Sequence, residues 1–204
     1  MPRFVSLPLL GRFARRAPRP WLFLPGFAVG LAVLGGCGES DPRLPVVDLA
    51  AIEAIIAEAD ANDRVLVIDF WATWCVPCVA MFPDVHEGLK ARGDAVRAVS
   101  ITLDDPGEME RNAVAFLKEH DALKDAYRMK PDGVEQARVV DALGERWQDV
   151  VIPAFLVFDR DGELAGEFLE GGDATVEAIL ARVDELTGER VEAGMGAGSE
   201  ADGG

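Results

Sequence analysis

Two cysteines separated by two residues form the part of the sequence best suited to chemistry, the motif Cys75-Val76-Pro77-Cys78. They follow a nearly continuous apolar run, residues 64–70, and precede a segment with helical spacing. Backbone N–H groups and the helix dipole at a helix N-terminus favour the thiolate of a cysteine placed there, here Cys75. Cys78 lies one turn later on the same face. The spacing predicts thiol–disulfide exchange, in which Cys75 attacks a target disulfide and Cys78 resolves the mixed disulfide.

The same two thiols allow two other interpretations. A structural zinc site needs four ligands, whereas the sequence holds no second C-x-x-C and only two histidines, His86 and His120. An inert structural disulfide between Cys75 and Cys78 also fits the spacing. We favour the redox pair, without a metal or another cofactor, and expect Cys75 to be the exposed thiol and Cys78 the shielded one.

The segments around the motif alternate between strand and helix patterns. Strands are expected over 64–70, 95–103, 154–158 and 163–169, the last two joined by the hairpin signal of residues 159–162. Helices are expected over 49–59, over 76–92, from Asp104-Asp105-Pro106 to about His120, and from a cap at Asp173 to Gly188. Strands that alternate with helices and end in a hairpin indicate an α/β sheet covered on both faces.

Two segments depart from this simple alternation. Residues 121–150 have a mostly helical, irregular pattern, and 118–138 carry five basic and five acidic side chains. This balanced stretch is either a partner surface or a solvated helical insertion, and we favour the insertion. The tail 189–204 is rich in Gly, Ala and acidic residues, which predicts disorder.

The first 36 residues have the composition of an export signal. They contain five arginines, no acidic residue and a 16-residue uncharged stretch, 21–36, whereas a spanning helix needs about 20 apolar residues. The stretch ends in Leu34-Gly35-Gly36-Cys37, which resembles a bacterial lipobox in which Cys37 takes the lipid. We expect a signal peptide over 1–36 and a linker over 37–45. The alternative is an uncleaved anchor, and both place the folded part outside the cytoplasm.

The charge of the chain excludes some partners. The net charge is −16, and residues 37–204 hold 15 basic against 36 acidic side chains. Because nucleic acid and anionic lipid would repel such a surface, we expect no nucleic-acid partner. Membrane attachment would come from the lipid on Cys37.

The residues around the cysteines resemble a known family. Asp69-Phe70-Trp71-Ala72, followed by Trp74-Cys75, Pro77-Cys78 and Pro83, is similar to a thioredoxin active site, and Ile152-Pro153 is similar to its cis-proline segment. The lipobox, Val99-Ser100-Ile101 and the 159–162 hairpin resemble the TlpA/ResA-type envelope oxidoreductases. The resemblance covers about 46–188. Met81 stands where that subgroup often has Glu, and Asp69 follows the thioredoxin pattern instead.

The resemblance implies a thioredoxin-like three-layer α/β/α sandwich. Its central sheet would be mixed, and a helical insertion, about 104–150, would precede the cis-Pro strand. Asp69 would be a buried carboxylate that moves the proton of Cys78; the alternative is a strand-end Asp that faces solvent. Trp74, Val76, Pro77, Ile152 and Pro153 would form the substrate-binding surface, with plain packing as the alternative for Trp74. Trp71 is expected in the core.

The function expected from these features is reduction of disulfides in specific envelope proteins. The resemblance names apocytochromes c and metal-centre assembly proteins as target classes. A transmembrane thiol donor would regenerate the Cys75–Cys78 dithiol on the periplasmic side. The alternative function is a non-catalytic metallochaperone that uses both thiols as ligands.

Overall fold

The computed structural model describes residues 43–147 and 150–188. The predicted signal peptide, Cys37, most of the predicted linker and the tail 189–204 lie outside these residues. None of the helices in the described part is both long and apolar enough to cross a membrane.

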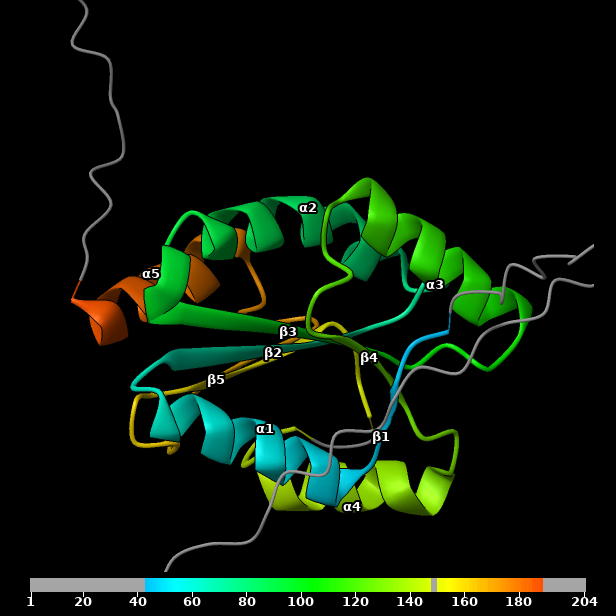
Figure 1. Ribbon diagram of the computed structural model, residues 1–204, viewed down its shortest axis with the longest axis horizontal. Helices are drawn as coiled ribbons and strands as arrows, with labels where there is room; N and C mark the ends of the chain where they lie inside the picture. Colours follow the sequence, from blue (N-terminus) through cyan, green and yellow to red (C-terminus); the bar gives the residue numbers. More distant parts are fainter. Residues whose placement is uncertain (1–42, 148–149, 189–204) are drawn as a thin grey trace, which may run out of the picture. The chain divides into compact units, whose positions relative to one another are not determined.

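A six-stranded mixed sheet forms the centre of the domain (Figure 1). Its strands are β1 (Val46–Val47), β2 (Val65–Trp71), β3 (Val96–Thr102), β4 (Ala126–Met129), β5 (Ala154–Phe158) and β6 (Leu164–Leu169). The order across the sheet is β1-β4-β3-β2-β5-β6. The first four strands in this order run parallel, whereas β5 is antiparallel to both β2 and β6. The predicted mixed sheet and its terminal hairpin are confirmed.

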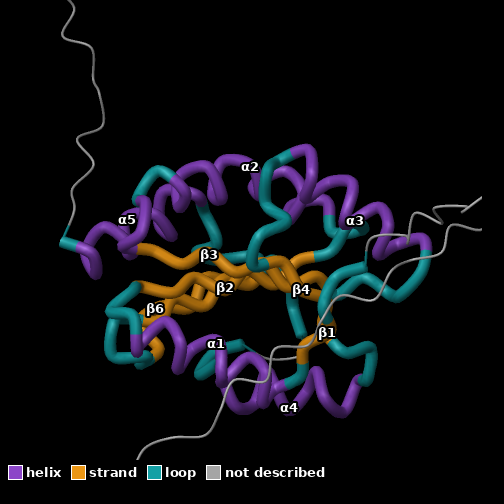
Figure 2. The backbone as a smooth tube through the Cα atoms, in the orientation of Figure 1, coloured by secondary structure: helices purple, strands orange, loops and turns teal. Residues whose placement is uncertain are grey.

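Helices cover both faces of the sheet, which gives the three predicted layers (Figure 2). The helices are α1 (Leu49–Ala61), α2 (Val76–Lys90), α3 (Glu108–Glu119), α4 (Gly133–Leu143) and α5 (Val176–Thr187), with a short 3-10 turn at Gly93–Ala95. Helices α1 and α4 lie on one face, and α2, α3 and α5 lie on the other.

Strand β2 is the element that carries the cysteine motif. Every residue of β2 is buried, as expected of a central strand with helices on both faces. It pairs over its whole length with β3, and its C-terminal end leads through residues 72–75 into α2. The motif therefore lies at the carboxyl edge of the parallel strands, where α/β proteins place their sites.

Two expectations about the elements differ from the structure. The segment 104–150 holds α3 and α4 as predicted, but it also contributes β4, a four-residue strand in the stretch for which the sequence predicts mostly helix. Asp173 does not cap the last helix, because Thr175 accepts the hydrogen bond from Ala178 N–H there. Asp173 instead accepts from Leu169 N–H.

The folded domain also begins before the expected boundary at residue 46. Leu44 is buried, and its N–H donates to Glu110 Oε1 over 3.0 Å. Glu110, itself buried, also lies beside Arg128 of β4. Arg128 and Glu135 are buried as well, so the balanced stretch 118–138 is not simply a solvated surface.

Candidate active site

Cys75 is the N-cap of α2. Its backbone is extended, with φ −86° and ψ 99°, and its Sγ accepts a hydrogen bond from the N–H of Cys78 over 3.3 Å. Pro77 lies in the first turn, where a helix tolerates a residue without an N–H. The sulfur of Cys75 thus occupies the place of a capping oxygen, where N–H groups and the helix dipole stabilise an anion.

Cys75 and Cys78 form a disulfide with a Cα–Cα distance of 5.3 Å. In this oxidised state both cysteines are buried, with Cys75 6% exposed and Cys78 2%. The expected contrast between an exposed Cys75 and a shielded Cys78 concerns the free thiols and stays a prediction. The residues on either side of Cys75 are exposed to solvent, Trp74 to 58% and Val76 to 79%. Access to Cys75 therefore runs across an apolar rim.

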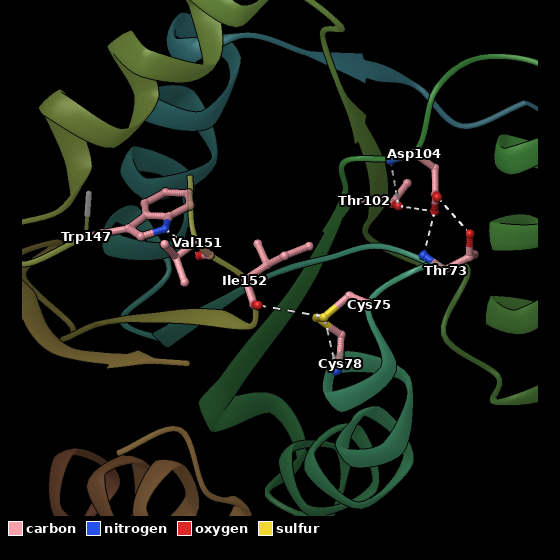
Figure 3. The surroundings of a disulfide bond; sticks show 8 residues. All are labelled: Thr73, Cys75, Cys78, Thr102, Asp104, Trp147, Val151 and Ile152. Atoms are coloured by element: carbon pink, nitrogen blue, oxygen red, sulfur yellow. Dashed lines mark hydrogen bonds between the residues drawn. A yellow bond between two sulfur atoms is a disulfide. The ribbon is translucent and has the colours of Figure 1, made fainter. Parts of the chain in front are cut away.

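The segment before β5 lies opposite the disulfide (Figure 3). The sulfur of Cys75 lies 3.8 Å from the carbonyl oxygen of Ile152, and the Ile152–Pro153 peptide bond is cis, as the resemblance implied. Both residues are buried, whereas Val151 next to them is exposed. The sequence placed this segment in the site, and the structure brings it to Cys75 from 77 residues away along the chain.

Three polar residues that the sequence analysis did not assign to the site fix the loop before Cys75 (Figure 3). The carboxylate of Asp104, only 1% exposed, accepts from Thr73 N–H over 3.0 Å and from the Thr73 hydroxyl over 2.7 Å. It also accepts from the hydroxyl of Thr102, at the end of β3, over 2.6 Å. The sequence showed Asp104 only as the start of a helix.

Trp147 supports the opposite side of the site. Its Nε1–H donates to the carbonyl oxygen of Val151 over 2.8 Å, and its ring packs on Phe70 with centroids 4.5 Å apart. The buried carboxylate of Glu167 on β6 accepts from the N–H of Trp147 over 3.1 Å. Gly144 allows this arrangement, because a Cβ there would lie 2.6 Å from the Cβ of Trp147. These contacts tie the cis-Pro segment to β2 and β6.

Asp69 is buried in the middle of the domain, which excludes the alternative of a solvent-facing Asp. The residue is 2% exposed, and its Oδ2 lies 3.0 Å from Nε2 of His86 on α2. Its Oδ1 finds no hydrogen-bond partner within the described part of the chain. Burial raises the pKa of Asp69, and the nearby imidazole of His86 only partly offsets this effect.

Trp71 belongs to the core, as predicted. It is fully buried, its ring centroid lies 5.0 Å from that of Phe82 on α2, and its Nε1–H donates to the hydroxyl of Ser100 over 2.7 Å. Among the tryptophans of the described residues, Trp71 and Trp147 are buried and Trp74 is the exposed one.

A comparison with family models matches residues 45–183 to the Redoxin family. Among curated proteins, the thioredoxin of Listeria monocytogenes is 35% identical over 51 residues, which cover 25% of this chain and 50% of that protein. The chain thus spans about half the length of the first curated relatives that it matches.

A longer match is the thiol:disulfide interchange protein HelX of Rhodobacter capsulatus, 27% identical over 150 residues, 73% of this chain and 76% of HelX. Among solved structures, a DsbF homologue from Corynebacterium diphtheriae has a TM-score of 0.51 at 24% identity. It covers 63% of this chain and 75% of its own. That structure supports the thioredoxin-like fold and no more.

Proposed function

The chain belongs to the Redoxin family, and from this premise we propose that it is a protein thiol–disulfide oxidoreductase whose reduced form reduces disulfides of partner proteins. The observation that carries the proposal is the position of the Cys75 sulfur. It caps α2 over the N–H of Cys78 and faces the Ile152 carbonyl beside an exposed apolar rim. That place combines a stabilised thiolate with a surface for a target chain.

The reaction proceeds in two exchanges. The thiolate of Cys75 attacks one sulfur of the target disulfide, forms a mixed disulfide, and releases the other target sulfur as a thiolate. Cys78 then loses its proton and attacks Cys75, which forms the Cys75–Cys78 disulfide and frees the second target thiolate. Two electrons pass from the protein to the target. Asp69 is the proposed acceptor of the Cys78 proton, because its carboxylate is buried and its raised pKa suits proton exchange.

The proposed substrate-binding surface consists of Trp74, Val76, Pro77, Ile152 and Pro153. The first three are exposed beside Cys75 on the α2 side. The other two lie across from the disulfide and contribute the carbonyl oxygen of Ile152 next to the sulfur. An extended target segment with an apolar residue near its cysteine fits this surface.

A reduction assay tests the activity. The reduced full-length chain, mixed with a protein that contains an accessible disulfide, should generate two target thiols per molecule oxidised, and Cys75→Ser should generate none. A metal titration of the same preparation serves as the counter-test, since tight metal binding without disulfide reduction would support a metallochaperone.

We also propose that the domain works on the extracytoplasmic side of a bacterial membrane, held by a lipid on Cys37. The support is the sequence of residues 1–37, with its basic start, short apolar stretch and lipobox-like end. A transmembrane thiol donor would regenerate the dithiol there, since reduction of a target leaves the Cys75–Cys78 disulfide. Mass spectrometry of the native protein should find a lipid-modified N-terminal Cys37. An unmodified Cys37 within an intact N-terminus would contradict this.

The Cys78→Ala variant would identify the partners, because its mixed disulfides cannot be resolved. Apocytochromes c and metal-centre assembly proteins with paired cysteines are the proposed targets. We expect a few discrete adducts that disappear with reductant and are missing in a Cys75→Ser, Cys78→Ala control. A broad smear of exported proteins would instead indicate a general oxidase or isomerase.

A further inference from the structure

The hydrogen bond between Asp69 and His86 joins the interior of the domain to a cavity on its surface. Asp69 itself does not line this cavity, but His86 does. The cavity has a volume of about 780 Å³ and lies between α2, β3 and the end of α3, with Pro83, Ser100 and His120 among its walls. His86 therefore stands between a buried carboxylate and a space that water can enter.

Helix α2 fixes the imidazole in this position. Cys78, Phe82 and His86 are spaced four residues apart and share one face of the helix. The imidazole stacks on the Phe82 ring with centroids 3.8 Å apart and an interplanar angle of 15°. The His86 side chain is 11% exposed, whereas that of Asp69 is 3% exposed. The Phe82 ring covers one face of the imidazole, so the edge of the imidazole can contact the Asp69 carboxylate and the cavity.

Several of the charged groups around the cavity form ion pairs. Asp69 on β2 faces His86 from the interior. The other charged or titratable side chains that line the cavity are Glu87 and Lys90 on α2, Arg97 on β3, Glu119 on α3, and Arg64, Asp94, His120, Asp121, Lys124 and Asp125 outside these elements. Lys90 pairs with Asp121, and Arg97 pairs with Asp125 and Glu58. The ring of His120 packs on Phe116. Among the described residues, Asp69 is the carboxylate that hydrogen-bonds His86.

We infer that His86 carries protons between Asp69 and water in this cavity during disulfide exchange. The inference rests on the proposed function and adds the route by which the Cys78 proton leaves. Cys78 gives its proton to the Asp69 carboxylate as it becomes the attacking thiolate. The carboxyl group then turns about its Cβ–Cγ bond, so that the protonated oxygen faces Nε2 of His86 and gives that proton to the ring, and His86 releases the proton on Nδ1 to a water molecule. One proton enters the pair and one leaves it.

The burial of the two groups explains why a relay is needed. Cys78 and Asp69 are each 2% exposed, so neither exchanges protons readily with bulk water. Oδ1 of Asp69, which has no partner among the described residues, is free to take the incoming proton, and Oδ2 already contacts His86. Imidazole is the side chain best suited to accept and donate a proton near neutral pH.

Chemical rescue separates a relay from a merely structural histidine. In His86→Ala the space left by the ring borders the cavity, so free imidazole can enter it. We expect the second-order rate constant for disulfide reduction at pH 7 to fall by roughly 10- to 100-fold, as for loss of a general acid–base group. Millimolar imidazole should restore most of it. The full-length chain in detergent is assayed, and thermal unfolding confirms that the variant is folded.

Two further variants provide the controls. His120→Ala removes the other histidine of the cavity, which has no bond to Asp69, and should keep the wild-type rate without an imidazole effect. Asp69→Asn combined with His86→Ala should be no slower than the slower single variant, and imidazole should not rescue it, because both residues lie on one route.

The outcomes separate the relay from the proposed function. A folded His86→Ala protein with the wild-type rate and pH profile, or one that is slow and unaffected by imidazole, would overturn the relay while the oxidoreductase stands. A wild-type chain that reduces no disulfide would overturn the proposed function, and the relay with it.

Discussion

Two buried aspartates lie beside the active-site loop, Asp69 in the strand before it and Asp104 bonded to Thr73 within it, yet their surroundings are opposite. Asp104 has both carboxylate oxygens hydrogen-bonded, by the Thr73 N–H, the Thr73 hydroxyl and the Thr102 hydroxyl. Asp69 has one bond, to His86, and its Oδ1 has no partner in the described residues. The two residues are equally hidden from solvent, at 1% and 2% exposure.

The difference separates two roles that sequence alone cannot distinguish. A buried carboxylate with both oxygens hydrogen-bonded stabilises the groups that bind it, and here it fixes the loop that leads to Cys75. A buried carboxylate with an open oxygen and one imidazole partner is poorly stabilised as an anion. Its anionic form therefore binds a proton readily, as a proton acceptor must. Substitutions at and around each residue test this contrast.

The largest expected effect follows from Asp104→Ala. The change leaves one N–H and two hydroxyl donors without their acceptor in a buried site, and hydrogen bonds to charged groups contribute about 1.5–3 kcal/mol each. We expect the free energy of unfolding to fall by about 3 kcal/mol or more. Denaturant unfolding measures it. Asp105→Ala, at the exposed neighbouring position, is the matched control and should change stability little. A loss below about 1 kcal/mol would contradict the role assigned to Asp104.

Asp69→Asn should have the opposite effect on stability while it impairs the reaction. Because burial raises the pKa of Asp69, the folded state holds the proton to a higher pH than the unfolded chain does. Wild-type stability therefore falls as the pH rises through that raised pKa, and Asn avoids this loss. The variant should be more stable than the wild type at neutral pH, with the difference shrinking toward acid pH.

The rate gives the second half of that prediction. Without a proton acceptor for Cys78, Asp69→Asn should reduce disulfides roughly 10- to 100-fold more slowly near pH 7. Unfolding curves and reduction rates measured over the same pH series check both parts. A variant that is less stable at neutral pH and as fast as the wild type would make Asp69 a structural residue like Asp104.

The sequence predicted the reactive residues of the site better than the residues that hold them in position. The cysteine motif, the strand before it and Ile152-Pro153 all carry local signals, namely spacing, an apolar run and a resemblance. The structure finds them at one edge of the sheet. The burial of Asp69, which the resemblance implied, agrees with its place in β2, where every residue is buried.

The residues that position the site depend on contacts between segments far apart in the chain, which leave no local signal in the sequence. Thr73 meets Asp104 only because β2 and β3 pair in register up to Trp71 and Thr102. His86 reaches Asp69 only because α2 lies across β2. The sequence does not predict β4, because this strand has only four residues, Ala-Tyr-Arg-Met, and one of them is a buried arginine that pairs with Glu110. Its strand state is set by tertiary pairing with β3 and β1 rather than by its own pattern.

A smaller effect is expected when one donor to Asp104 is removed. Thr73→Val keeps the shape of the side chain and the backbone N–H bond but loses the hydroxyl that donates to Oδ1. One acceptor is left unsatisfied in a buried place, so we expect a loss of about 2 kcal/mol in the free energy of unfolding. Thr73→Ser keeps the hydroxyl and should lose less than about 1 kcal/mol. A loss in Thr73→Val that is no larger than the loss in Thr73→Ser would contradict a dominant contribution from the hydroxyl's hydrogen bond.

The smallest effect should come from Trp147→Phe. This variant tests whether Trp147 only positions the cis-Pro segment and takes no part in proton transfer. The variant keeps an aromatic ring against Phe70 and loses the Nε1–H bond to the Val151 carbonyl. Val151 is 38% exposed, so water can replace part of that bond, and we expect a loss of about 1 kcal/mol. The reduction rate should fall by only a few fold, because Ile152 moves slightly relative to Cys75, and the pH profile should keep its wild-type shape. A shifted pH profile would mean that Trp147 also affects proton transfer. The contrast between groups that only position the site and the proton acceptor Asp69 would then fail.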